Sequence, residues 1–328
     1  MIAAKFALRT IVVTGALVLS ARAQVSVKAS SNRLEVLIEE KPFTTLYFGP
    51  DVPKPYLHPL RAASGTIVTR RYPMENVEGE IKDHEHHRGL WFAHGNVNGY
   101  DFWANEPGFY PPDRLVRIVM AKLVAVHEGQ KAGSVETVFE WQDPKHKALL
   151  REARTMIFYS EPSLRIIDFD INLMAVQIVR FGDTKEGTFA IRRAAGLEEH
   201  WEGEPSLPAR TGRLVNAEDL VGESQIWGKR SDWVDGSGAI DGEKVGIAIF
   251  DHPGNPRHPT YWHVRSRGLM AANIFGWHDF LHDKWVDAGM TLNPGEFLRF
   301  RYRVVIHPGD AVTAGLAELY AKYAGPRQ

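Results

Sequence analysis

The chain of 328 residues contains no cysteine, which excludes disulfide bonds and thiolate catalysis and leaves stability to an ordinary core. It also lacks an excess of either charge, because 39 basic and 40 acidic residues give a net charge of −1 at pH 7. This balance does not favour nucleic acid as a partner. Beyond residue 23, no apolar run reaches the roughly 20 residues that a membrane span needs, so stable membrane insertion is not expected.

The N-terminus has the layout of a cleavable export signal. Two basic residues precede an apolar run at 11–19, and the small-residue pattern Ala-Arg-Ala follows at 21–23. We therefore expect a signal peptide over residues 1–23 and a mature protein that starts at Gln24. Its expected location is the periplasm or the outside of the cell.

Apolar and polar residues alternate along most of the chain, which predicts strands. The alternating runs lie at 33–39, 115–127, 134–141, 164–175, 188–194, 245–250, 261–264 and 297–306. Clusters of Gly, Pro, Asn and Asp separate these runs, and no strand–helix–strand rhythm is present. The pattern favours an all-β fold, a large antiparallel sandwich of the galactose-mutarotase-like kind, as a single domain over residues 24–328.

One helix is expected, near the C-terminus. Asp310 can cap the segment 311–325, and the pair Gly325-Pro326 can end it. Helical spacing gives this segment one apolar face. That face comprises Val312, Leu316, Leu319, Tyr320 and Tyr323.

Four of the 14 histidines lie in the segment DHEHHRGLWFAH, between Asp83 and His94. If this segment is extended, His84 and His86 share one face and His87 points to the other. A His-x-His pair on a strand commonly presents two imidazoles to one metal ion. A divalent metal held by His84, His86 and His94 is therefore one alternative, although no cofactor is certain from the sequence.

The same imidazoles suit a second alternative without metal, because histidine titrates near neutral pH and can transfer protons. On this interpretation His86, His87 and His94 are catalytic residues. Arg88, the next residue, would bind an anionic substrate group or an oxyanion. Any one histidine can be explained by a hydrogen bond to loop backbone, but four together favour a clustered site.

Aromatic and polar residues follow the histidines in GLWFAHGNVNGYDFW. Residues 96–99, Asn-Val-Asn-Gly, predict a tight turn with positive φ. Trp91 and Trp103 are predicted to stack on a sugar, while Asn98 and Asp101 bind its hydroxyl groups. The alternative is that the tryptophans fill the core and the polar residues only form the turn.

The downstream segment TKEGTFAIRR contains one carboxylate and three cationic residues, of which Lys185 and Arg192 are candidates. Alternation places Glu186 and Arg192 on one face of a strand and Lys185 on the other. Glu186 is a candidate catalytic acid or base, and Lys185 and Arg192 are candidates for substrate binding. An exposed ion pair along the strand is the alternative.

A second downstream segment, FDHPGNPRHPTYWH, adds Asp251, His252 and His258 to the residues expected to bind substrate. Nine of the 14 histidines lie either in 83–94 or in 251–282. Two histidine-rich segments so far apart in the chain predict one shared pocket at an edge of the sandwich.

These blocks, together with WVDGSG at 233–238, resemble the bacterial family labelled PmoA-like, or "methane oxygenase PmoA", over nearly the whole mature chain. The chain departs from the family pattern at Glu85, where proline is usual. A methane monooxygenase subunit has several membrane spans and this chain has none after residue 23, so methane oxidation is not expected. The resemblance implies an exported protein found beside sugar oxidoreductases and carbohydrate-degrading enzymes.

Three functions are open at this point, and all take a carbohydrate as partner. The first is an enzyme that hydrolyses or eliminates across a glycosidic linkage, including that of an oxidised 3-keto sugar, by removing a proton next to a carbonyl. The second is a sugar-binding or accessory protein without catalysis, and the third is a mutarotase-like epimerase. The lack of an obvious pair of catalytic carboxylates disfavours an ordinary glycosidase.

Overall fold

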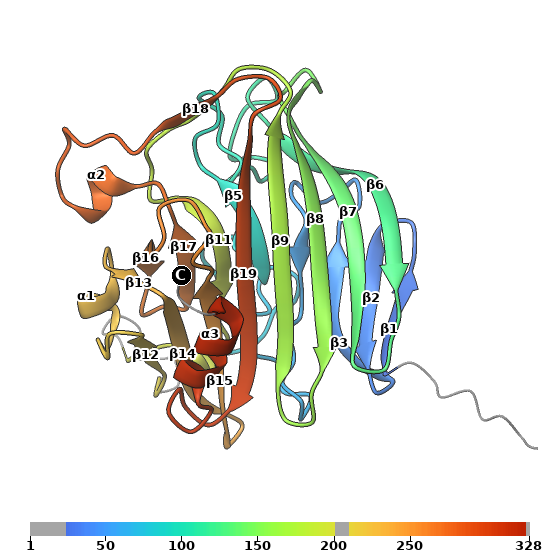
Figure 1. Cartoon of the computed structure of the whole chain (residues 1–328), viewed down its shortest axis with the longest axis vertical. Coiled ribbons are helices and arrows are strands. Elements are labelled where there is room, and N and C mark those ends of the chain that lie inside the picture. Colours follow the sequence, from blue (N-terminus) through green and yellow to red (C-terminus); the bar gives the residue numbers. More distant parts are fainter. Residues whose placement is uncertain (1–23, 201–209, 326–328) are drawn as a thin grey trace, which may run out of the picture.

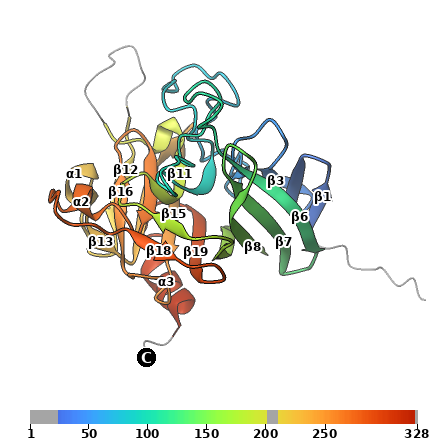
Figure 2. The same ribbon diagram turned by 90° about the horizontal axis from the view of Figure 1, so that it is seen from above.

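The computed structural model describes residues 24–200 and 210–325 and contains two large sheets that pack against each other (Figures 1 and 2). All neighbouring strands in both sheets run antiparallel. The predicted all-β antiparallel sandwich is therefore confirmed. Among the described residues, no helix is long and apolar enough to cross a membrane.

The first sheet has nine strands and the second has eight. In spatial order the first contains β1 (Val25–Ala29), β2 (Arg33–Ile38), β3 (Lys41–Tyr47), β4 (Tyr56–Leu57), β5 (Leu90–His94), β11 (Gly187–Arg192), β17 (Leu269–Asn273), β16 (Thr260–Val264) and β13 (Arg230–Ser231). The second contains β12 (Arg213–Asn216), β14 (Trp233–Ile240), β15 (Glu243–Asp251), β19 (Phe297–Pro308), β9 (Arg165–Ala175), β8 (Ala148–Ser160), β7 (Ala132–Gln142) and β6 (Arg117–His127).

Short elements complete the described fold. A two-stranded ladder pairs β10 (Val179–Phe181) with β18 (Met290–Leu292). The helical segments are a 3₁₀ turn at Ala195–Leu197, α1 (Glu223–Ile226), α2 (Trp277–Phe280) and α3 (Leu316–Ala324).

The core fills the space between the sheets because inward positions alternate along the strands. On β7, for example, Val135, Thr137, Phe139 and Trp141 are buried, whereas the residues that alternate with them are partly exposed. The ring of Trp141 lies 6.0 Å from that of Phe92 on β5, so the two sheets meet through aromatic contacts. This packing fixes β5 and β11 in the middle of the first sheet, where the candidate site begins.

All eight alternating runs form strands: β2, β6, β7, β9, β11, β15, β16 and β19. Other strands, among them β5, β8 and β17, were not predicted from alternating runs. β5 and β17 are buried at every position, so both faces are apolar and period two disappears. β8 has 13 residues, but its alternation is not visible in the sequence because the charged residues Glu152 and Arg154 occupy inward positions.

The C-terminal helix exists but begins later than the sequence predicted. Asp310 caps a turn, because its Oδ1 accepts a hydrogen bond from the Thr313 backbone N–H at 2.8 Å, and α3 starts only after Gly315. Leu316 and Tyr320 are buried as expected, but Val312 is 89% exposed because it lies in that preceding turn.

A buried ion pair inside the sandwich generates a stability prediction. Glu152 is inaccessible to solvent and accepts hydrogen bonds from Arg154 Nε at 2.6 Å and Trp141 Nε1 at 2.8 Å. Arg154→Met is expected to lower the free energy of unfolding by about 3–5 kcal/mol, because the carboxylate is left buried without its cation. Urea denaturation at pH 7 measures this change.

The matched control lies on the same strand. Arg151 pairs with Glu140 at 3.3 Å, but its side chain is 56% exposed. Arg151→Met should therefore change stability by less than about 1 kcal/mol. Equal unfolding midpoints for the two variants would contradict the role assigned to the buried pair.

Candidate functional site

The histidine block forms a turn rather than the expected extended segment. His84 has φ of 45°, and the His87 N–H donates to the His84 carbonyl at 2.9 Å. The turn gathers His84, His86 and His87, because the His87 ring centroid lies 4.3 Å from that of His86 and 4.9 Å from that of His84. The expectation that His87 points away from the other two was wrong.

Two buried arginines hold this turn through one carboxylate. Asp83 Oδ1 accepts hydrogen bonds from Arg70 Nη1 and Arg192 Nη2, both at 2.7 Å, and its Oδ2 lies 2.9 Å from His84 Nδ1. Burial by itself would raise the pKa of Asp83, but the His84 hydrogen bond and the two guanidinium charges lower it below the ordinary value. Asp83 is therefore ionised and ties the histidine turn to β11.

Arg192 also fixes the orientation and tautomer of His87. Its Nη1 lies 3.1 Å from His87 Nδ1. A guanidinium group can only donate, so Nδ1 is the acceptor and the proton of the neutral ring lies on Nε2. That Nε2 is buried without a hydrogen-bond partner among the described residues. Trp91 stacks against the ring at 5.0 Å, which leaves it one orientation.

Residues at the start of β11 form the opposite wall. Lys185 Nζ lies 3.5 Å from Glu186 Oε1, and both side chains are about one-third exposed. His263 on β16 has its Nδ1 3.0 Å from the Lys185 carbonyl oxygen. A carbonyl can only accept, so Nδ1 carries the proton and Nε2 keeps a lone pair. The two fixed imidazoles thus have opposite tautomers.

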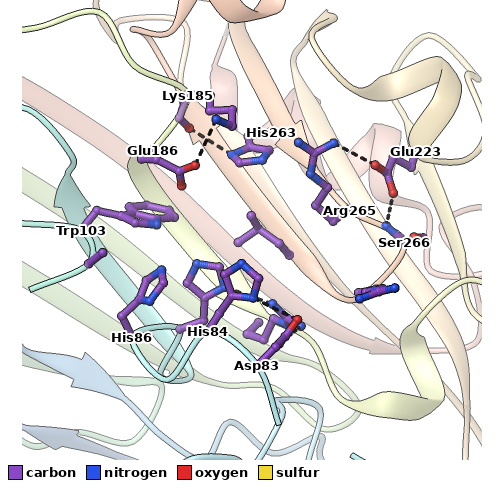
Figure 3. A pocket seen from close by; sticks show the side chains of 15 residues that line it. Asp83, His84, His86, Trp103, Lys185, Glu186, Glu223, His263, Arg265 and Ser266 are labelled. Atoms are coloured by element: carbon purple, nitrogen blue, oxygen red, sulfur yellow. Dashed lines mark hydrogen bonds and ion pairs between the residues drawn. The ribbon is translucent and has the colours of Figure 1, made fainter. Parts of the chain in front are cut away.

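A cavity of about 640 Å³ lies between these walls. Figure 3 shows Lys185, Glu186 and His263 on one side, the histidine turn with Asp83 on the other, and Trp103 beside Glu186. A third wall contains Glu223, whose carboxylate accepts hydrogen bonds from Arg265 Nη1 at 2.9 Å and from the Ser266 N–H at 2.6 Å. Volume and concave shape suit a small-molecule ligand.

Burial determines the protonation states of several side chains that line the cavity. It lowers the pKa of His86 to about 2 and that of His263 to about 3, and it lowers the pKa of His87 well below the ordinary value. Neighbouring cations add to each effect. Burial raises the pKa of Glu186, although Lys185 opposes the change. At neutral pH the cavity therefore combines neutral imidazoles with a carboxyl group that titrates closer to neutrality than usual.

Several of the predicted site residues line this cavity: His84, His86, His87, Trp103, Lys185, Glu186 and Arg192. Lys185 and Glu186 share a wall despite their adjacent positions, because regular β11 begins only at Gly187 and alternation does not apply before it.

His94 and Trp91 lie in the core instead. His94 is 1% exposed, its Nε2 donates to the Gly182 carbonyl at 2.8 Å, and its ring packs against Phe275 at 4.5 Å. Trp91 is inaccessible to solvent, so it supports His87 and cannot stack on a sugar. The catalytic role expected for His94 and the sugar contact expected for Trp91 were wrong, because strand β5 is buried on both faces.

Arg88, Asn98 and Asp101 serve the surrounding loops. Arg88 turns away from the histidines and pairs with Glu106 through bonds of 3.0 and 2.6 Å. Asn98 has φ of 54° in the predicted turn, and its Oδ1 accepts a bond from a backbone N–H across the loop. Asp101 accepts hydrogen bonds from two backbone N–H groups and the Tyr110 hydroxyl. Their acceptors and donors are used internally, which corrects the substrate-binding roles predicted for them.

The second histidine-rich segment divides between two places. His263 reaches the first cavity, but Asp251, His252 and His258 do not. His252 and His258 line a separate cavity of about 780 Å³, where His258 Nδ1 lies 2.8 Å from the buried carboxylate of Asp251. The expectation of one shared pocket for all these residues was therefore wrong.

The metal set suggested by the sequence does not assemble. His94 lies in the core, apart from His84 and His86 in the cavity wall. Within residues 24–200 and 210–325, no three His, Asp or Glu side chains are grouped so as to hold a metal ion together.

Sequence reasoning missed four residues that build the cavity: Arg70, Asp83, His263 and Glu223. Asp83 and His263 stand at the ends of the two quoted histidine-rich segments, so their place beside other ionisable residues was a usable signal. Arg70 and Glu223 lie in segments without any pattern that marks them.

The sequence matches DUF6807, a family of unknown function, over residues 33–321. The chain belongs to this family. No curated protein matches it in sequence.

Among solved structures, the chain is similar to a galactose mutarotase related enzyme from Lactobacillus acidophilus, with 7% identity and a TM-score of 0.36, over 87% of this chain and 98% of that one. It is also similar to the GH36 alpha-galactosidase AgaB from Geobacillus stearothermophilus, with 10% identity and a TM-score of 0.41, over 88% of this chain and 42% of that one. The chain spans less than half the length of that galactosidase.

The protonation state of the cavity can be checked by NMR titration of the histidine rings. His86 and His263 should keep constant ring shifts between pH 5 and 8, because burial holds their pKa values at about 2 and about 3. His258 provides a contrast in the same spectra. Burial alone would lower its pKa, but hydrogen bonds to Asp232 and Asp251 raise it to about 9.

Single His→Gln variants assign the signals, and the protein in concentrated urea is the control, since unfolded histidines titrate near about 6.5. A ring of His86 that titrates near this reference in the folded protein would show that water reaches the histidine turn freely.

Proposed function

We propose that this protein is a carbohydrate-active enzyme in which Glu186 transfers the proton. The observation that carries this proposal is the position of its carboxyl group, in a concave site opposite neutral imidazoles and with a pKa raised by burial. Such a group suits acid–base chemistry near neutral pH. Trp103 borders the same cavity, but its side chain is only 1% exposed and packs against Trp91, so the sugar-stacking role predicted for it was wrong. The resemblance to the PmoA-like family supports a carbohydrate as substrate.

The number of available carboxylates in the cavity favours elimination over ordinary glycoside hydrolysis. An ordinary glycosidase uses two carboxyl groups, one as acid and one as base or nucleophile. Asp83 is bound by two arginines and Glu223 by Arg265 and Ser266. Glu186 has only the looser contact with Lys185, so one carboxyl group is available for proton transfer.

In the proposed reaction the substrate is a glycoside oxidised to a ketone at carbon 3. Glu186 takes the proton from carbon 2, the electron pair of that C–H bond forms a double bond to carbon 1, and the bond from carbon 1 to the leaving oxygen breaks. Glu186 then returns the proton to the leaving oxygen, so the step needs no oxidant or reductant. Later addition of water to the double bond would make the net reaction a hydrolysis.

We assign His87 the stabilisation of the enolate oxygen. Its Nε2 carries a proton that has no acceptor among the described residues. A neutral imidazole can donate to an oxygen on which negative charge develops, and a low pKa keeps it neutral throughout the reaction. Binding of the oxyanion, which the sequence suggested for Arg88, is thus assigned to the His87 ring. Arg192 holds that ring in place.

The proposal is tested with a panel of glycosides and 3-keto-glycosides. The wild-type protein should release the leaving alcohol from a 3-keto-glycoside, and Glu186→Gln should lower kcat by about 10²- to 10⁴-fold because the proton acceptor is lost. Glu136→Gln, on β7 and outside the cavity, is the matched control and should keep wild-type kcat.

Other outcomes would overturn the proposal in distinct ways. Unchanged turnover in Glu186→Gln would remove the acid–base role. Exchange of aldose anomers without release of an alcohol would indicate a mutarotase-like epimerase. Sugar binding without any turnover would indicate a binding or accessory protein.

We also propose that the protein is exported, on the evidence of the N-terminal pattern, which lies outside the described residues. The expected product is a chain that starts at Gln24 in a periplasmic or culture fraction. Mass spectrometry of the protein from its native host measures this N-terminus, and a chain that retains Met1 would contradict export by a cleaved signal.

A further inference from the structure

A second cavity lies on the outer side of β19, about 780 Å³ in volume, and it shares no lining residue with the first. The loop after β15, with His252 and His258, forms one wall, and Tyr320 of α3 forms another. Figure 1 shows α3 beside β15 and β19, at the open face of the second sheet. Arg301 of β19 lines this cavity and also the smaller hollow next to it.

Arg301 differs from the two arginines that flank it on the same face of β19. Arg299 forms a two-pronged ion pair with Asp170, and Arg303 forms one with Asp168 through bonds of 2.6 and 2.7 Å. Arg301 lies opposite Asp170 in the strand register, but that carboxylate is already occupied by Arg299. Within the described ranges, the guanidinium group of Arg301 has no carboxylate partner.

The Nε of Arg301 is buried and has no acceptor among the described residues. A buried donor without an acceptor costs free energy, and a cationic one costs more than a neutral one. The guanidinium group lies close against Gly254, where any side chain would collide with its Nη2. Glycine at this position therefore leaves space for the guanidinium group. The fold thus holds an unsatisfied cation in the wall of a cavity.

The two histidines near Arg301 can donate hydrogen bonds, but neither adds a positive charge without a partner. His252 Nδ1 accepts a bond from the Gly254 N–H at 2.9 Å, so its Nε2 carries the ring proton. His258 is positively charged, and it is paired on both sides, because Asp251 and Asp232 lie 2.8 and 3.3 Å from its two nitrogens. Among the described residues, the Arg301 guanidinium group has no carboxylate in contact with it.

We propose that this second cavity binds a small molecule bearing one carboxylate group, which accepts a two-pronged pair of hydrogen bonds from Arg301. The planar fork of a guanidinium matches the two oxygens of a carboxylate. A single negative charge matches the one guanidinium group of this wall that has no carboxylate in contact with it within the described ranges. A second negative charge would face the carboxylates of Asp232, Asp168 and Asp170, so a phosphate dianion fits less well.

The experiment titrates the ¹⁵N-arginine-labelled full chain with D-glucuronate and follows the Arg301 Nε–H signal, assigned from its absence in Arg301→Lys. The signal should shift with saturation, while neutral D-glucose gives no shift and inorganic phosphate binds at least several-fold more weakly. Arg301→Gln should weaken glucuronate binding, measured by calorimetry, at least about tenfold, because a charge-assisted pair is lost.

Controls separate this site from net charge and from the catalytic proposal. Arg151→Gln removes the same charge from an exposed position on β8 and should keep the wild-type affinity. Arg301→Gln should keep wild-type turnover in the glycoside assay, so the two proposals fail independently. An Nε signal unmoved by glucuronate, equal affinity in Arg301→Gln, or tighter binding of phosphate would overturn the inference.

Discussion

The candidate active site depends on one carboxylate, Asp83, shared by two buried arginines. Arg70 and Arg192 come from segments more than 100 residues apart, and like charges so close in a low-dielectric interior repel each other. The ionised Asp83 between them removes that cost, and each of its oxygens has a partner. Because Arg192 belongs to β11 and Asp83 precedes the histidine turn, this contact joins the loop to the middle of the first sheet. The positions of His84 and His87 follow from it.

The same burial that makes this network necessary determines the chemistry of the cavity. Charged imidazolium rings would lie among guanidinium groups in a poorly solvated site, so His86 and His87 are neutral. A neutral imidazole offers a defined donor or acceptor only if its tautomer is fixed. Each wall of the cavity fixes the tautomer of one ring. Arg192 makes His87 a donor at Nε2, and the carbonyl of Lys185 makes His263 an acceptor at that atom. Because His87 and His263 have opposite tautomers, a ligand between them can accept a hydrogen bond from one ring and donate one to the other.

The strand pattern was predictable because period-two alternation records which face of a strand is buried, and this held for the long strands β7, β9 and β19. Residue types also led to His86, His87 and Glu186 as candidates. Alternation could not place His94 or Trp91, since β5 is buried on both faces and its sequence looks the same whether a residue lines a cavity or fills the core. Nor could spacing separate His258 from His263, because the loop that leads into β16 places His258 in the wall of the second cavity and His263 in the wall of the first.

Charge pairing distinguishes the two cavities from each other. In the first, Asp83 and Glu223 are held by guanidinium groups, whereas Glu186 has a single lysine, about one-third exposed, as its partner. In the second, His258 has carboxylate partners, as do Arg299 and Arg303 beside it on β19, whereas Arg301 has none in the described part of the chain. Each cavity therefore has one ionisable group that the fold pairs less tightly than its neighbours. A carboxyl group in that position can exchange a proton with a ligand, but a guanidinium group stays charged at any physiological pH and can only hold an anion.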